Sequence, residues 1–299
     1  MSDSSKIEWT DATWNPVTGC TKVSPGCDHC YAETFAERWR GTPGHHFENG
    51  FDVTLRPERL EQPRAWKKPR RIFVNSMSDV FHEAVPDDFI LSMFAIMAVT
   101  PQHRYQVLTK RHGRMRSLLS RPKFSQDIKD LLWQLDGGIA WRRHHWPLPN
   151  VWLGVSVEDQ KWADIRIPAL LDTPAAVRFI SAEPLLGPVS LWHLIDPKGS
   201  GVEEPRKLDW IIAGGESGPG ARPCDLNWLR GLRDQCEWSG SAFFLKQLGR
   251  HLGRELGAGS KGGDWDAWPE DLRVREFPEG ADEANMWHRI AMRGGRRAS

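Results

Sequence analysis

The stretch Val151–Ser181, VWLGVSVEDQKWADIRIPALLDTPAAVRFIS, contains the alternation that decides the fold. It begins with a short apolar run, Val151–Val157, continues with helical spacing over Gln160–Leu171, and returns to an apolar run at Val177–Ser181. Short apolar runs rich in β-branched residues are typical of buried strands. Because a helix between two strands is long enough to carry the chain back across a sheet, this stretch predicts two parallel neighbouring strands.

The same alternation recurs along the chain. Further strands are expected at Arg71–Ser76, Arg104–Thr109, Asp209–Ala213 and Ala242–Lys246, and further helices at Tyr31–Arg40, Asp87–Val99 and Leu226–Trp238. Alternating strands and helices predict an α/β fold with a mainly parallel sheet, and six or seven units fit a full or partial (β/α) barrel. Each expected strand is followed by polar or glycine-rich residues, and ligands bind at this end of parallel strands.

Two segments interrupt the alternation. Residues 120–150 contain an expected helix, Phe124–Leu135, followed by a basic, aromatic stretch, and are typical of an insertion. Residues 251–299 are rich in glycine and charge and end in RGGRRAS. We therefore expect a single barrel-like domain over residues 1–250 and an irregular C-terminal extension over residues 251–299.

Composition narrows the class of protein. The 299 residues include 40 Lys or Arg and 39 Asp or Glu, a net charge of +1 that argues against a basic nucleic-acid wrapper. With 39% hydrophobic residues the chain has enough apolar side chains for a large core. The N-terminus resembles no signal peptide and no apolar run is long enough to span a bilayer, so we expect a cytoplasmic protein without a membrane partner.

The strongest chemical signal is a cluster of three cysteines, Cys20, Cys27 and Cys30, in the pattern C-x6-C-x2-C. Three thiolates so close in sequence favour a thiophilic metal. One alternative is zinc, with a fourth ligand from His29, His45 or His46. The other is an iron–sulfur cluster with three protein ligands and one iron left open for an exogenous ligand. Isolated cysteines such as Cys224 and Cys236 are more often ordinary buried thiols.

The cysteine segment carries a resemblance to known enzymes. GCDHCYA, preceded by NPVTGC, resembles the cluster loop of radical S-adenosylmethionine enzymes and is distantly similar to that of spore photoproduct lyase. It departs from their usual pattern by three extra residues between Cys20 and Cys27 and by His29 at a position that is usually aromatic.

A longer series of motifs resembles a narrower group, the phage-type three-cysteine-motif family of phage and bacterial genomes. In order, these motifs are NPVTGC, CDHCYAE, FVNSMSDVFHE, VLTKR, WLGVSVED, RFISAEPLLGP, IIAGGESGPGARP, LRDQC and FFLKQLG. They run from about Trp9 to about Pro269.

The resemblance implies a partial (β/α) barrel of the radical S-adenosylmethionine type, with a [4Fe-4S] cluster on Cys20, Cys27 and Cys30. It also implies S-adenosylmethionine as cofactor, an external electron donor and a 5′-deoxyadenosyl radical. A nucleic-acid base or nucleotide is the first substrate class to consider, and a three-Cys-motif protein a possible partner. The alternatives are a zinc-bearing nucleic-acid-binding or partner-binding protein without turnover, and a barrel whose cluster is only structural.

Polar residues at the expected strand ends are the candidate cofactor ligands. Asn75 and Ser76 could hydrogen-bond the methionine end of the cofactor, or could form a helix-capping turn. Ser156 and Glu158 could meet ribose hydroxyls, or could begin the following helix. Glu183 follows another strand, where its side chain could enter the barrel mouth or make a buried structural hydrogen bond.

The loop Gly214–Pro223, GGESGPGARP, is the second unusual segment. Gly214 and Gly215 would allow a ligand to approach the backbone closely, whereas an ordinary strand-to-helix loop is the alternative. Glu183, Glu216 and Lys246 are the candidate catalytic residues, and a salt bridge is the alternative role of Lys246.

Two basic segments are candidates for nucleic-acid contact, because cations interleaved with aromatic residues bind phosphates and stack on bases. A solvated charged face is the alternative. The residues are Lys110, Arg111, Arg114 and Arg116, together with Arg142, Arg143, His144 and His145 between Trp141 and Trp146.

Overall fold

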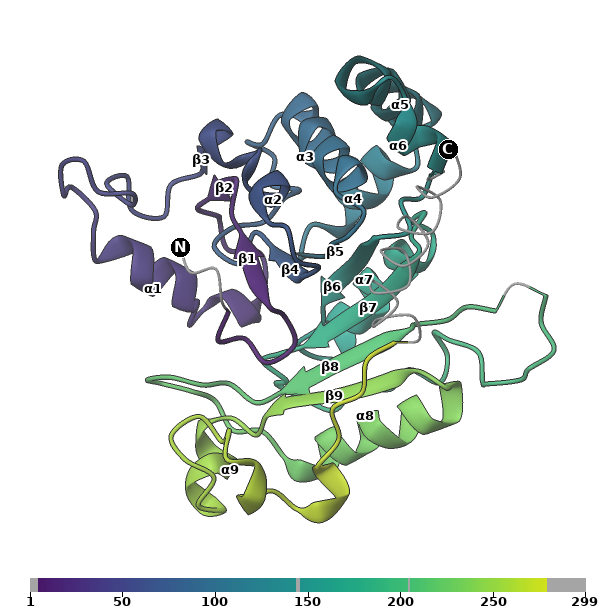
Figure 1. Ribbon diagram of the computed structural model, residues 1–299. Helices are drawn as coiled ribbons and strands as arrows, with labels where there is room; N and C mark the ends of the chain where they lie inside the picture. Colours follow the sequence, from purple (N-terminus) through teal and green to yellow (C-terminus); the bar gives the residue numbers. More distant parts are fainter. Residues whose placement is uncertain (1–4, 144–145, 204, 279–299) are drawn as a thin grey trace, which may run out of the picture.

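The computed structural model describes residues 5–143, 146–203 and 205–278, and its centre is one parallel sheet (Figure 1). The strands are β1 (Ala12–Trp14), β4 (Arg71–Val74), β5 (Arg104–Thr109), β6 (Val151–Ser156), β7 (Val177–Ala182), β8 (Trp210–Gly214) and β9 (Ala242–Gln247). All neighbouring strands pair in parallel, and their order in the sheet follows their order along the chain. The sheet forms a half-barrel. The predicted α/β class and partial barrel are confirmed.

The helices are α1 (Tyr31–Glu37), α2 (Gln62–Ala65), α3 (Asp87–Val99), α4 (His112–Leu119), α5 (Pro122–Asp136), α6 (Ile139–Arg143), α7 (Gln160–Leu171), α8 (Leu226–Ser239) and α9 (Arg250–Glu255). The longer ones, α3, α4, α5, α7 and α8, contribute buried side chains to one continuous apolar core, whereas α1 lies apart from them (Figure 1). A small antiparallel pair, β2 (Val17–Thr18) and β3 (Thr54–Leu55), lies beside the sheet. The side chain of Asp159 caps α7 by accepting from the Trp162 amide, so the helix begins where the sequence predicts.

An aromatic cluster fills the concave face of the sheet. Trp210 is fully buried at its centre and packs edge-on against Trp9, Trp152 and Phe244. Many of the tryptophans therefore serve as core residues rather than as stacking platforms. Gly154 makes this packing possible, since a Cβ there would lie 2.5 Å from the Phe179 ring.

The insertion and the extension both pack on the domain. Helices α5 and α6 of the insertion pack against α3. In the extension, Trp268 and Leu272 are buried in the main core and Phe277 packs on Trp210, so its described part belongs to the folded domain. The final RGGRRAS lies outside the described residues. Within the described ranges, no helix combines the length and the apolar character needed to cross a membrane.

Candidate functional site

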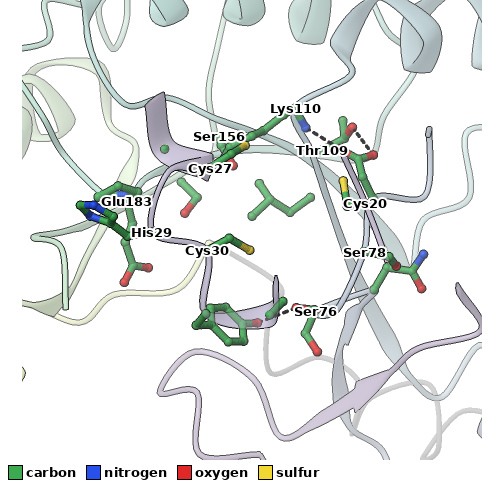
Figure 2. A pocket seen from close by; sticks show the side chains of 18 of the residues that line it. Cys20, Cys27, His29, Cys30, Ser76, Ser78, Thr109, Lys110, Ser156 and Glu183 are labelled. Atoms are coloured by element: carbon green, nitrogen blue, oxygen red, sulfur yellow. Dashed lines mark hydrogen bonds between the residues drawn. The ribbon is translucent and has the colours of Figure 1, made fainter. Parts of the chain in front are cut away.

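A pocket of about 350 Å³ lies at the carboxyl ends of the strands, as the polar strand ends predict (Figure 2). Cys20, Cys27 and Cys30 all line it. Figure 2 shows the three side chains on different sides of one space. The strand-end residues that line the same pocket are Asn75, Ser76, Ser156, Ser181, Glu183, Gly215 and Lys246. The fold thus brings the cysteines together with most of the candidate ligands.

The loop Gly19–Cys30, called the cysteine loop below, carries all three thiols across the strand ends. Gly19 begins it in a left-handed conformation, with φ of 88°, and bridges to Ser78 after β4. Any side chain at Gly19 would collide with the backbone of Asp52, because a Cβ would lie 2.2 Å from its carbonyl oxygen. At the other end, Cys30 is the residue before α1 and fixes the loop to that helix.

Arg111, which follows β5, holds the first cysteine. Its Nη1 lies 3.4 Å from Cys20 Sγ, and its Nη2 donates to Thr21 Oγ1 at 2.7 Å. Thr21 Oγ1 also lies 2.9 Å from Nε2 of the buried His82. Burial and the nearby Asp79 carboxylate raise the pKa of Cys20 to about 11, although Arg111 opposes this shift. The Cys20 thiol is therefore protonated at neutral pH, and any metal that bound it would have to displace this proton.

Glu158, which follows β6, holds the middle of the loop. It is fully buried and accepts from Ser24 Oγ at 2.7 Å and from Arg166 Nη1 at 2.8 Å, while Lys110 Nζ lies 3.1 Å away. Burial alone would raise the pKa of Glu158, but these cations and the Ser24 hydroxyl outweigh it and lower the pKa. This carboxylate is occupied, and the structure makes it a support of the cysteine loop rather than a ligand of ribose.

Glu216, which follows β8, holds the last part of the loop. Its carboxylate accepts from the backbone and guanidinium of Arg222, and lies 3.2 Å from His29 Nδ1. Arg222 in turn donates to the Pro25 carbonyl at 2.9 Å and pairs with Asp28 at 3.3 Å. Although burial opposes ionisation, these hydrogen bonds lower the pKa of Glu216. This candidate catalytic residue therefore already has partners. It connects the loop Gly214–Pro223, called the GGESG loop below, to the cysteine loop.

Glu183 and Lys246, the other two catalytic candidates, form an ion pair in the pocket wall. Lys246 Nζ lies 2.7 and 2.9 Å from the two carboxylate oxygens of Glu183, and Gln247 Nε2 donates to the same group at 3.0 Å. Both side chains retain about a fifth of their exposure, since Lys246 is 20% and Glu183 17% exposed. The pair faces the pocket and could exchange its internal partners for the charged groups of a ligand.

The candidate cofactor-binding residues have different environments. Asn75 has a left-handed backbone, with φ of 58°, and neither atom of its buried side-chain amide has a hydrogen-bond partner among the described residues. Ser76 is tied to the loops, because its hydroxyl donates to Asn15 and its carbonyl accepts from Tyr31. Ser156 is 4% exposed, and its carbonyl accepts from Arg166.

The two glycines of the GGESG loop are explained by close packing. A Cβ at Gly215 would lie 2.2 Å from the Leu248 carbonyl oxygen, and one at Gly214 would lie 3.3 Å from that of Gln247. The segment Gln247–Leu248 therefore leaves no room for a Cβ at Gly215 and little at Gly214, which favours the strand-to-helix loop over close approach of a ligand.

The first predicted basic surface is largely used inside the protein. Lys110 pairs with Glu158, Arg111 lies 3.7 Å from Asp79, Arg114 pairs with Asp87 and Arg116 with Asp172. In the second segment, Arg142 packs over Trp133. The side chain of Arg143 and residues His144 and His145 lie outside the described part of the chain. The ion pairs of the first segment favour structural roles, and the structure gives no support to nucleic-acid contact there.

The histidines considered as zinc ligands are engaged elsewhere. His45 stacks on Trp39, His46 contacts Arg59, and only His29 of the three lines the pocket. Within the described residues, no three His, Cys, Asp or Glu side chains surround a common point as ligands of one ion would.

Fold and site together define a parallel α/β half-barrel with a thiol-lined pocket at the carboxyl edge of its sheet. The chain belongs to the DUF5131 family, described as a protein family of unknown function, whose profile matches residues 4–293. No curated protein and no solved structure has significant similarity to the chain.

Proposed function

We propose that this protein is a radical S-adenosylmethionine-like enzyme that holds a [4Fe-4S] cluster on Cys20, Cys27 and Cys30. The observation that carries the proposal is that all three cysteines line one strand-end pocket, which the Glu183–Lys246 ion pair also lines. A volume of about 350 Å³ is in the range of small-molecule sites, about 300–1,000 Å³. The partial barrel is the architecture that the resemblance implies.

When bound, the cluster and S-adenosylmethionine would supply one-electron reductive cleavage of the cofactor to methionine and a 5′-deoxyadenosyl radical, which takes hydrogen from a substrate. The chain's residues hold and shield these groups. Arg111, Glu158 and Glu216 set the course of the cysteine loop. Trp9 and Phe73 pack together and line the pocket with apolar surface, which would shield a bound group from water. The Glu183–Lys246 pair offers opposite charges to a zwitterionic ligand.

The proposed substrate class is a nucleic-acid base or nucleotide, and its support is the resemblance to spore photoproduct lyase. The electron comes from an external one-electron donor, and a three-Cys-motif protein is the proposed partner.

Anaerobic reconstitution of the full chain with iron and sulfide tests the proposal. We expect about four irons per chain, together with 5′-deoxyadenosine formed from S-adenosylmethionine under dithionite. Cys20→Ala, Cys27→Ala and Cys30→Ala should each abolish cluster binding, whereas Cys224→Ala, a buried thiol elsewhere, should retain it. Stoichiometric zinc without iron uptake would instead establish the binding-protein alternative. Four irons without cofactor cleavage would indicate a structural cluster.

A further inference from the structure

Arg111 is a buried cation in contact with the sulfur of Cys20. Its side chain is 8% exposed, and Nη1 lies 3.4 Å from Cys20 Sγ. Its buried Nε has no hydrogen-bond partner in the part of the chain that the structure describes, since the Glu83 carboxylate stays 3.6 Å away. Burying a guanidinium in this way is costly unless a negative charge lies beside it.

Two carboxylates lie beside Arg111, but neither hydrogen-bonds it. Asp79 Oδ2 lies 3.7 Å from Arg111 Nη1 and Glu83 Oε2 lies 3.6 Å from Nε, both too far for a hydrogen bond. Asp79 is also occupied by other donors, since Oδ1 accepts from Thr109 Oγ1 at 2.7 Å and Oδ2 from the Lys110 amide at 2.9 Å. The guanidinium therefore has capacity for a further anion on the side of Cys20.

The shape of the arginine side chain matches the loop. One nitrogen, Nη1, faces Cys20 Sγ, while Nη2 donates to the hydroxyl and carbonyl oxygens of Thr21. A planar guanidinium makes these contacts together, whereas a lysine ammonium is a compact point charge. The contact fixes the start of the segment between Cys20 and Cys27, which is three residues longer than in the enzymes that the cysteine segment resembles.

We infer that Arg111 is a positioning and charge-compensating residue for the metal group on the cysteines, stabilising the anionic Cys20 ligand and the reduced cluster. The inference rests on the proposed function. A cation near a cluster sulfur favours addition of an electron, since reduction increases negative charge, and hydrogen bonds to sulfur are among the features that set cluster potentials.

Potentiometric titration of the reconstituted full chain, followed by electron paramagnetic resonance, tests this inference in three variants. Arg111→Gln removes the charge and Arg111→Lys retains it. Arg116→Gln removes an exposed arginine of α4 that pairs with Asp172. We expect Arg111→Gln to disfavour cluster reduction about tenfold, a potential about 59 mV more negative. In competition with a chelator it should retain iron about 10- to 100-fold less strongly.

Arg111→Lys keeps the charge without the planar fork, so it should restore most of the potential but only part of the iron retention, and Arg116→Gln should match the wild type. The inference is overturned if Arg111→Gln has the wild-type potential and iron retention, or if Arg111→Lys has the potential of Arg111→Gln, because positive charge would then not be the cause. If the wild-type chain itself takes up no iron, the proposed function fails, which is a separate result from any difference among the variants.

Discussion

The carboxylate of Glu158 accepts a 2.7 Å hydrogen bond from the hydroxyl of Ser24, a residue 134 positions earlier in the chain. Gly26 packs against the same carboxylate so closely that a Cβ would lie 2.5 Å from Glu158 Oε1. These two contacts hold the centre of the cysteine loop against the carboxyl end of β6. Because Glu158 also pairs with the fully buried Arg166, the loop is attached to the protein core rather than to a mobile surface.

Glu158→Gln should strongly destabilise the fold. The amide keeps the size of the side chain but leaves Arg166 without its buried counter-charge, and breaking a buried ion pair from one side costs about 3–5 kcal/mol. Urea denaturation followed by circular dichroism measures the loss in free energy of unfolding. Asp164→Asn is the control, since its carboxylate is 47% exposed and should change stability by less than about 0.5 kcal/mol. Equal effects of the two substitutions would contradict a structural role for the buried pair.

The stabilisation by Glu158 should depend on pH. Its folded pKa is lowered from the ordinary value of 4.5, so the contribution is fully present above the unfolded pKa and is lost as pH falls through the folded pKa. The difference in unfolding free energy between wild type and Glu158→Gln should stay constant near neutral pH and shrink below about pH 4.5. Denaturation at several pH values measures it. A difference that grows on acidification would show that folding does not lower the pKa of Glu158.

Gly154→Ala should disturb the aromatic core. The added Cβ would lie 2.5 Å from the fully buried Phe179 ring, and overpacking of this kind costs about 1–3 kcal/mol. Gly113→Ala in helix α4 is the matched control, because a Cβ there meets nothing within 4 Å and alanine favours helix by about 1 kcal/mol. Thermal unfolding of both variants should show opposite changes in Tm. A shift in the same direction would contradict the assigned packing.

Asn75 should tolerate glycine better than alanine. Its φ of 58° lies in the left-handed region, which costs a residue with a Cβ about 1–2 kcal/mol. Both substitutions remove the unpartnered amide, so the difference between them isolates the backbone term. Asn75→Gly should therefore unfold at higher denaturant than Asn75→Ala. At Ser92 within α3 the order should reverse, because alanine is the better helix former. If alanine is also the more stable replacement at Asn75, backbone strain at that position is ruled out.

Local patterns predicted most of the fold. The helices Asp87–Val99 and Gln160–Leu171 and the strand Arg104–Thr109 have the predicted bounds. Strand β1 was missed because its three residues are too few to show periodicity, and α4 because its polar and basic residues suggested a charged surface. The short strand is specified instead by its pairing with β4.

The candidate site was predictable in location but less so in roles. Polar strand ends and clustered cysteines pointed to one pocket, and Glu183 and Lys246 do face it. No pattern in the sequence links Arg111 to Cys20 or Arg222 to Pro25, since each contact joins residues about ninety or more positions apart. Glu216 likewise has ordinary surroundings in the sequence and acquires its partners only when two loops meet.

The sequence by itself determined the strand and helix alternation, and with it a parallel sheet whose carboxyl edge collects the polar loops, because periodicity and connection length act locally. The tertiary structure decided which of those polar groups remain open to a ligand. Sheet register and loop packing place Glu158 and Glu216 in contact with the cysteine loop, whereas the Glu183–Lys246 pair lies in the pocket wall. A carboxylate has only a few hydrogen-bonding sites, and what fills them depends on neighbours that only folding brings together.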